Sequence, residues 1–495
     1  MTIQQRKARC SVRGDMMLPH IHFDPERTAA YSADKAAVRL VFALAASKTL
    51  EESRESAPEN RQPNFRHYDL PSAFTSEHYS FHKPCYVLQM PLADGSYLHP
   101  NCRVGLLVLN LYGTIPAGLI FNEGLDDHLQ KHGFQQTEAE TCIYKKQTKD
   151  GTAIISTSTD DLFVYATTDA AQQDFKSRMQ QKYRIKDLGF PSQFLGWKAQ
   201  YKEGIHISQP TLVRKLLEQA NLTNSNNKST PLPTNANFDV SDKTTPLSTK
   251  DTKLFQMLIG GLRYLSDSTR PDITFATSKL ARYSRTPHCI RMTLLRHVLR
   301  YLTKTPNHGI HYSQRENNPL ETYTDADFAE SPDRKSTSGA VHISFGAPVQ
   351  WSSRKQGTVA LSTWEAEYIA ATTALQKTTW LRRLIEELKA TKLEPTKFHI
   401  DNQGALLTAK NAGKTKRRKH IDVKAHYLIH HYKKKTIDPI KCSSNDMKAD
   451  IFTKALPVTK HEAQTNMLMS DAHAAPNPGS GESVALHKHK FMIQH

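Results

Sequence analysis

The sequence has few cysteines, no long apolar run and no segment typical of a secretion signal. Its six cysteines lie at positions 10, 85, 102, 142, 289 and 442, and no two lie within four residues of each other. This spacing excludes the usual zinc fingers and zinc knuckles and argues against a disulfide scaffold. The longest apolar runs, Val38–Ala46 and Val104–Leu109, are too short to cross a bilayer, which takes ~18 residues. We therefore expect an intracellular protein with reduced thiols and no membrane partner.

The sequence does have a large excess of basic residues. Sixty-six Lys and Arg residues stand against 48 Asp and Glu residues, which gives a net charge of +18 over 495 residues. Apolar residues make up 38% of the chain, which is enough to build packed cores in two to four domains. The charge favours a polyanionic partner such as nucleic acid, and a basic solvated surface without a partner is the alternative.

Changes in composition divide the chain into five segments. Residues 5–220 mix strand and helix patterns, and residues 221–251, rich in Asn, Ser, Thr and Pro, are expected to form a linker or extended loop. Residues 252–310 have helical periodicity, with one apolar stripe at 295, 298, 299 and 302. Residues 318–457 alternate strand and helix patterns, and residues 458–495 are expected to be a disordered tail.

Two local patterns in the first segment are informative. The apolar stretch 36–46 predicts a helix. Asp160 and Asp161 lie between the β-rich runs 153–159 and 162–166, which predicts a hairpin with both acids at its turn.

The segment 318–457 has the order strand, strand, strand, helix, strand, helix. The expected elements cover residues 321–327, 339–345, 348–352, 365–389, 397–401 and the start of a helix at 404. This order predicts an α/β domain with helices on a mixed sheet.

Four acids of this domain lie at strand or helix ends. Asp325 lies on the first strand, Glu367 in the first turns of the long helix, Asp401 at the end of the fourth strand, and Asp450 at the start of a C-terminal helix. Any one of them alone is more often a solvated surface group. Together, such acids would repel one another unless divalent cations such as Mg²⁺ neutralised them. Two such ions ~3.5–4 Å apart can assist a phosphodiester displacement.

Six motifs of this domain carry a specific resemblance. They are YTDAD (323–327), RKSTSG (334–339), STWEAEY (362–368), IDNQGA (400–405), KHIDV (419–423) and KADIFTKAL (448–456). In this order they resemble the ribonuclease H domain of copia-type LTR retrotransposons. The resemblance implies that Asp325, Glu367, Asp401 and Asp450 are catalytic acids that bind metal. Asp327 and Glu365 are the weaker competitors for the first two positions.

Motifs upstream resemble the reverse transcriptase of the same elements. They are RKARCSVRGD (6–15), YDLPSAF (68–74), LYGTIPAG (111–118), STDD (158–161), FLGWKAQYKEGIHISQPTLVRKLL (194–217) and TRPDITFATSKLARYS (269–284). The resemblance implies fingers, palm and thumb followed by a ribonuclease H-like domain, an α+β and α/β multidomain fold. It also implies that Asp69 and Asp160 bind metal with support from Asp161, and that Lys7 and Arg9 bind the incoming nucleotide. Ordinary surface bases are the alternative for Lys7 and Arg9.

Three positions depart from the polymerase pattern. Ser158 stands where the family has an aromatic side chain near the primer end, Ile115-Pro116 stands where it has polar residues, and Phe121 replaces a Trp. Proline also lacks an N–H donor. Because the ribonuclease H acids are all present, our hypothesis is that nuclease activity is better preserved than polymerase activity.

The stretch 410–441 is strongly basic and includes KRRK. Such a stretch can follow phosphates without reading sequence, and a nuclear-localisation signal is a rival explanation for KRRK. A structural role is an alternative for the histidine of the KHIDV motif. The nucleic-acid-binding candidates are Lys416, Arg417, Arg418, Lys419 and His420.

The resemblance implies an RNA-directed DNA polymerase with ribonuclease H activity, dependent on Mg²⁺ or alternatively Mn²⁺. The implied partners are an RNA template, a DNA primer, an RNA–DNA hybrid, dNTPs, and a second copy or the integrase of the same element. The implied location is a cytoplasmic virus-like particle or the nucleus, for part of a longer polyprotein. One alternative is a catalytically inactive nucleic-acid-binding relic. Another is an integrase, which would need a zinc module that the cysteine spacing does not provide.

Overall fold

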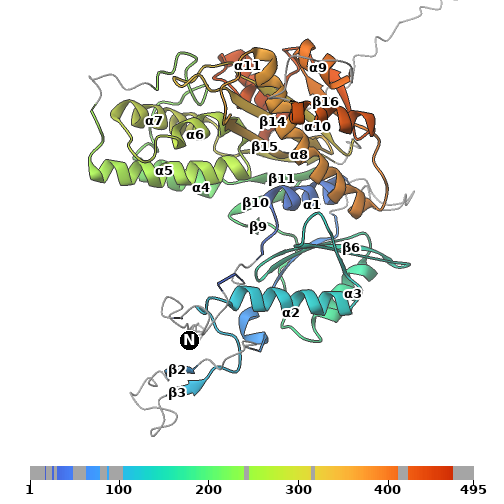
Figure 1. Cartoon of the computed structure of the whole chain (residues 1–495). Helices are drawn as coiled ribbons and strands as arrows, with labels where there is room; N and C mark the ends of the chain where they lie inside the picture. The colour runs from blue at the N-terminus through green and yellow to red at the C-terminus, as the bar shows by residue number, and fades with distance from the viewer. Residues whose placement is uncertain are drawn as a thin grey trace, which may run out of the picture.

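The computed structural model describes residues 17, 25–26, 31–47, 63–78, 86–88, 104–238, 245–313, 318–410 and 422–471. Figure 1 shows a lower part built on one sheet, an upper part of helices and two five-stranded sheets, and helix α1 (Lys35–Ser47) between them. Within these described ranges, no helix is both long enough and apolar enough to span a membrane.

The lower sheet is antiparallel throughout. Its order is β4-β5-β6-β7-β1-β8. The strands are β1 (Phe65–Asp69), β4 (Gln135–Gln136), β5 (Ile143–Thr148), β6 (Gly151–Ser158), β7 (Asp161–Ala166) and β8 (Lys186–Asp187). Side chains alternate between its faces, so Tyr68 packs with helices α2 (Ala117–Lys131) and α3 (Asp169–Met179), while Phe65 packs against Phe42 of α1. The chain also forms the short helix η2 (Ala73–Ser76) and a separate antiparallel pair, β2 (Tyr86–Leu88) and β3 (Val104–Leu106).

The upper part contains a second sheet and a group of helices. The second sheet has the order β18-β12-β11-β10-β9, over Ser470–Asp471, His308–Ser313, Gly204–Ser208, Trp197–Tyr201 and Gln193–Phe194. The helices are α4 (Pro210–Gln219), α5 (Thr249–Ser268), η3 (Pro271–Ile273), α6 (Thr274–Ala281) and α7 (Cys289–Lys304). The predicted helical segment is confirmed, and all four residues of its apolar stripe are buried. Leu232 and Phe238 pack into the same core, so the described part of 221–251 lies against these helices.

The C-terminal domain has the mixed sheet that the sequence predicted. Its order is β15-β14-β13-β16-β17. The strands are β13 (Glu321–Ala326), β14 (Thr337–Ser344), β15 (Ala347–Lys355), β16 (Thr396–Ile400) and β17 (Ile437–Lys441). The first three pair antiparallel, and β16 and β17 add in parallel to β13. The helices are α8 (Thr363–Lys389), α9 (Gln403–Lys410) and α10 (Asp422–Lys433). This strand order is that of a ribonuclease H-like fold.

The predicted tail starts too early in the sequence. Residues Val458–Leu468 form helix α11, which follows the short turn η4 (Asp450–Phe452), and β18 comes after it. His461, Gln464 and Leu468 are buried, and the Gln464 amide donates to the carbonyl of Met447 at 2.8 Å. Both polar contacts and the packing of Leu468 and Met469 into the core hold the segment against the domain.

Buried polar contacts join the lower and upper parts. The Arg39 guanidinium of α1 donates to the carbonyls of Val349 at 2.7 Å, Asp267 at 2.9 Å and Ser268 at 3.0 Å. It also lies 4.2 Å from the ring centroid of Trp351. One side chain therefore ties α1 to both α5 and β15.

Helix α8 also contacts the lower sheet directly. The Trp380 indole N–H donates to the carbonyl of Ala139 at 2.7 Å, and Arg383 pairs with Glu138. Both partners lie in the loop between β4 and β5, so the C-terminal domain rests on the lower sheet through the second half of α8.

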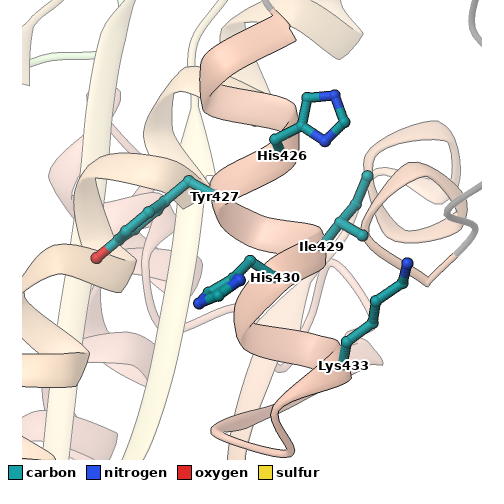
Figure 2. A pocket seen from close by; sticks show the side chains of 5 residues that line it. All are labelled: His426, Tyr427, Ile429, His430 and Lys433. Atoms are coloured by element: carbon teal, nitrogen blue, oxygen red, sulfur yellow. The ribbon is translucent and has the colours of Figure 1, made fainter.

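Helix α10 borders an open cavity of about 430 Å³. Figure 2 shows Tyr427 and His430 pointing to one side of the helix and His426, Ile429 and Lys433 pointing to the other. None of the five lining residues is acidic, so Lys433 gives this surface a positive charge.

Candidate functional site

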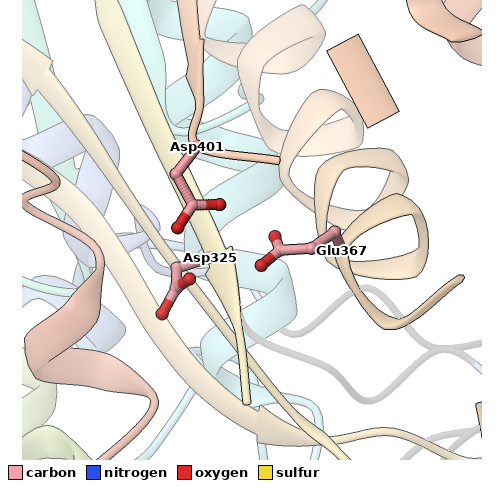
Figure 3. Close-up of side chains that lie close together, drawn as sticks. All are labelled: Asp325, Glu367 and Asp401. Carbon is pink, nitrogen blue, oxygen red and sulfur yellow. The ribbon is translucent and has the colours of Figure 1, made fainter. Parts of the chain in front are cut away.

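Three carboxylates of the C-terminal domain converge on one point. Asp325 is on β13, Glu367 is in the second turn of α8, and Asp401 directly follows β16. One oxygen of each lies within 4.8 Å of the others, and Figure 3 shows the three side chains pointing toward one another. β13 and β16 are parallel neighbours, which brings Asp325 and Asp401 to the same edge of the sheet.

Asp325 is the most buried of the three, with 2% of the residue exposed. Its Oδ2 accepts a hydrogen bond of 2.5 Å from the Thr453 hydroxyl, and the Lys454 ammonium lies 3.8 Å from the same oxygen. Burial raises the pKa of Asp325 to about 7; Lys454 opposes this shift and the charge of Asp450 adds to it.

Glu367 and Asp401 are shifted in the same direction. Burial raises the pKa of Glu367 well above its usual range, and the charges of Asp325 and Asp401 raise it further. Burial also raises the pKa of Asp401, with Asp450 adding to the shift and Lys454 opposing it. The three carboxylates therefore hold protons more tightly than exposed acids do, unless a cation compensates their charge.

Asp450 lies beside this group but has partners of its own. Its Oδ1 is 2.8 Å from the Lys454 ammonium, and its Oδ2 is bonded to the Lys460 ammonium. Burial acts to raise the pKa of Asp450, but the hydrogen bonds from the two lysines outweigh it and the pKa is lowered. The structure thus brings three of the four predicted acids together and gives the fourth two ammonium partners.

The two competing acids have structural roles. Asp327 accepts a hydrogen bond from the backbone N–H of Thr337, which closes the end of the β13–β14 pair. The Glu365 carboxylate accepts from the N–H of Leu361 at 2.9 Å, and the N-cap Ser362 accepts from the N–H of Glu365. This reciprocal arrangement is close to a capping box, in which the acid satisfies a free N–H at the start of α8.

The donor set fits a divalent cation. All three candidate ligands are carboxylates, the oxygen donors that Mg²⁺ prefers. Glu367 Oε2 is buried and has no hydrogen-bond partner within the described structure, which is costly for a polar atom unless something else satisfies it. The three acids could therefore hold one cation between them.

A second group of acids lies at the end of the lower sheet. Asp69 is the last residue of β1 and lies directly opposite Asp161, the first residue of β7. Ser158 pairs with Asp161, so the predicted hairpin is confirmed with Thr159 and Asp160 as its two-residue loop. The Leu70 N–H donates to the Asp160 carbonyl at 3.0 Å, which ties the loop to the end of β1.

His67 is a neighbour that sequence reasoning missed. Its Nε2 is hydrogen-bonded to Asp161 Oδ1 at 2.7 Å, and its ring stacks on Phe163 at 4.8 Å between centroids. Residues 67 and 69 share one face of β1 because side chains alternate along a strand, and that spacing was the available clue. Asp161 therefore has a fixed partner.

Known proteins match large parts of this chain. Residues 2–234 match the family described as reverse transcriptase (RNA-dependent DNA polymerase). The transposon Ty5-1 protein of Saccharomyces cerevisiae is 32% identical over 307 residues, which cover 61% of this chain and 97% of that protein. The chain belongs to the reverse transcriptase family of copia-type retrotransposons.

Other relatives of this reverse transcriptase family are much longer. The retrovirus-related Pol polyprotein from transposon TNT 1-94 of Nicotiana tabacum is 30% identical over 375 residues, covering 74% of this chain. The chain spans 28% of that relative. A solved structure, the foamy viral protease-reverse transcriptase dRH in complex with double-stranded DNA, is 12% identical. The match covers 81% of this chain and 62% of the solved chain, with a TM-score of 0.44.

Three departures from the family pattern have structural explanations. Ser158 is buried, and its hydroxyl bonds the Ser32 hydroxyl at 2.9 Å. Pro116 is the N-cap residue of α2, where the missing N–H costs nothing because that group has no intrahelical acceptor. Phe121 is fully buried with Tyr183 near it, so it serves as a core residue of the lower domain.

Several predicted binding residues lie outside the described part of the chain. They are the nucleotide-binding candidates Lys7 and Arg9 and the nucleic-acid-binding candidates Lys416, Arg417, Arg418, Lys419 and His420.

Gly339 of the RKSTSG motif shapes the site through its lack of a side chain. A Cβ at Gly339 would lie 2.6 Å from the Thr453 Cγ2 and 2.9 Å from the Ala449 carbonyl oxygen. Only glycine lets the η4 turn approach β14 this closely, and that approach places Thr453 and Lys454 beside Asp325.

Proposed function

We propose that the C-terminal domain is a divalent-metal-dependent ribonuclease that cuts the RNA strand of an RNA–DNA hybrid. The observation that carries this proposal is the convergence of Asp325, Glu367 and Asp401 within 4.8 Å on a ribonuclease H-like sheet. The family membership supports it, because a reverse transcriptase makes the hybrid that such a nuclease consumes.

The three acids have defined tasks in this proposal. Asp325, Glu367 and Asp401 would hold one Mg²⁺ or Mn²⁺ ion at the end of β13 and β16. When bound, such an ion lowers the pKa of a coordinated water and offsets charge on the phosphate. A water attacks the phosphorus, the bond to the 3′ oxygen breaks, and a 3′-hydroxyl is left. The RNA 2′-hydroxyl is the group that lets a site distinguish RNA from DNA.

The lower domain is proposed to be the RNA-directed DNA polymerase. Asp69 and Asp160 would hold the divalent ions, Asp161 would support them through its bond to His67, and Lys7 and Arg9 would bind the incoming dNTP. The register of Asp69 opposite Asp161 supports this assignment. Support for the nuclease is stronger, because its three side chains converge, whereas Asp161 is committed to His67.

The proposed partners are an RNA template, a DNA primer and their hybrid. The basic stretch 410–441 would contact the phosphates, and the positive charge of Lys433 beside the α10 cavity agrees with that. Association with a second copy or with the integrase of the same element, in a virus-like particle or the nucleus, belongs to this proposal.

The proposal is tested with a labelled RNA–DNA hybrid and the whole chain. The wild type should cut the RNA strand with Mg²⁺ and leave a matching DNA duplex intact. Asp401→Asn should lower the cleavage rate at least ~100-fold, which corresponds to ~2.7 kcal/mol, while hybrid affinity stays within twofold. Glu394→Gln, which removes an exposed carboxylate of the same domain, is the matched control. Tight hybrid binding without any cleavage by a folded wild type would instead support an inactive nucleic-acid-binding relic.

A further inference from the structure

Both oxygens of Asp450 are already bonded to cations of the protein. Lys454 follows it by four residues and bonds Oδ1, and Lys460 comes from α11 and bonds Oδ2. Asp450 is 2% exposed, so water does not replace these partners. A divalent ion could bind Asp450 only after displacing an ammonium group.

Lys454 also reaches Asp325. Its Nζ is 2.8 Å from Asp450 Oδ1 and 3.8 Å from Asp325 Oδ2, so the ammonium lies beside both acids, whose side chains are also hydrogen-bonded to each other. The Thr453 hydroxyl bonds the same Asp325 oxygen at 2.5 Å. The side of Asp325 that faces Asp450 is thus occupied, and the side that faces Glu367 and Asp401 is the one left for a metal.

The charges of the group agree with this division. Four ionised carboxylates, Asp325, Glu367, Asp401 and Asp450, carry −4, and the ammonium groups of Lys454 and Lys460 carry +2. The sum is −2, which one divalent ion balances. A second divalent ion beside both ammonium groups would bring the sum to +2, and excess charge next to largely buried carboxylates is unfavourable.

We propose that the Lys454 ammonium occupies the position between Asp325 and Asp450 where a second divalent cation would otherwise bind, so that this centre holds one divalent ion. The inference rests on the proposed metal centre and deepens it. In the resting protein, Lys454 supplies the positive charge on the Asp450 side, and Asp325, Glu367 and Asp401 hold the metal on the other side.

The test is the number of Mn²⁺ ions bound, measured by calorimetry and by electron paramagnetic resonance of free Mn²⁺. The whole chain is used with Asp69→Asn, which removes the proposed polymerase centre. The Asp69→Asn protein should bind one Mn²⁺ ion. Adding Lys454→Met should create a second site, which binds Mn²⁺ at least tenfold more tightly than the Asp69→Asn protein binds any second ion. Adding Asp450→Asn should remove that second site again.

The controls separate this inference from the proposed function. Lys460→Met leaves Lys454 between the acids and should leave one ion bound, and Lys454→Arg should also bind one ion because it keeps the charge. Melting curves without metal confirm that each variant is folded. The inference would be overturned if the protein that keeps Lys454 bound two Mn²⁺ ions. It would also be overturned if Lys454→Met bound one ion with unchanged Mn²⁺ affinity. Either result would leave the nuclease proposal standing. If Glu367→Gln leaves Mn²⁺ binding unchanged, the proposed metal centre itself is wrong.

Discussion

Asp325 lies directly opposite Gly339 in the antiparallel pairing of β13 and β14. The missing side chain of Gly339 is what allows the η4 turn to pack against β14, and η4 carries Asp450 and leads into Thr453 and Lys454. The geometry around Asp325 therefore depends on the missing side chain of Gly339.

Gly339→Ala should displace η4 from β14. The added Cβ meets the Thr453 side chain and the Ala449 carbonyl at distances that real Cβ atoms do not show. Overpacking of this kind costs about 1–3 kcal/mol, and we expect a lower melting temperature and weaker Mn²⁺ binding. Gly357→Ala is the matched control, because a Cβ there meets nothing within 4 Å. Equal melting temperatures for the two variants would show that the packing of η4 against β14 does not depend on Gly339.

The two glutamates at the start of α8 should have separable effects. Glu365→Ala removes the acceptor for the Leu361 N–H, and loss of a helix cap costs roughly 0.5–2 kcal/mol. Mn²⁺ affinity should change less than threefold in that variant. Glu367→Gln should show the opposite result, with metal binding lost and the melting temperature kept. Calorimetric titration and thermal unfolding of both variants give the comparison, and weaker Mn²⁺ binding in Glu365→Ala than in Glu367→Gln would reverse the assignment.

The metal-free protein should lose stability as pH rises toward neutrality. The pKa of Asp325 is raised to about 7 in the folded state, above an unfolded value of ~3.9. The folded state therefore binds the Asp325 proton more tightly than the unfolded state does. Protonation of Asp325 stabilises the folded state fully below ~pH 4, and this stabilisation is lost as pH rises through about 7. Asp325→Asn should flatten this fall, as measured by unfolding in a chelator from pH 4 to 8.

Metal binding should have the opposite pH dependence. The carboxylates must lose their protons to bind a cation, so Mn²⁺ affinity should increase between about pH 6 and 8 as Asp325 ionises. Titrations at several pH values measure this directly. An affinity that does not change across this range would show that the Asp325 proton and the metal do not compete.

Arg39→Lys should loosen the contact between the lower and upper parts. A lysine has one ammonium group and cannot reproduce the planar guanidinium that bonds three carbonyls and covers Trp351. We expect a loss of about 2–4 kcal/mol in stability and faster hydrogen exchange in α1 and β15. Arg354→Lys changes an exposed arginine and is the control. Unchanged exchange in α1 would mean that Arg39 does not join the two parts.

The sequence was most informative where residue type and position along the chain determine the site. Asp325, Glu367 and Asp401 could be predicted because the order of strands and helices sends the ends of β13 and β16 and the start of α8 to the same edge. The partners of Asp450 could not be predicted in this way. Lys454 and Lys460 reach it only because η4 and α11 pack closely, and α11 has no apolar stripe to indicate that it folds.

The lower domain shows the same limit. The hairpin at Asp160 was visible from the alternating pattern on both sides of it. The bond between His67 and Asp161 depends on which residues pair across β1 and β7. A shift of one residue in that pairing would have turned His67 to the other face, and the sequence does not specify the register by itself.

The most direct test of the metal centre is an anomalous difference map from crystals of this chain soaked in Mn²⁺. A peak coordinated by carboxylate oxygens of Asp325, Glu367 and Asp401 is the predicted result. A map without a peak among these three side chains, at a Mn²⁺ concentration that supports hybrid cleavage in solution, would contradict it.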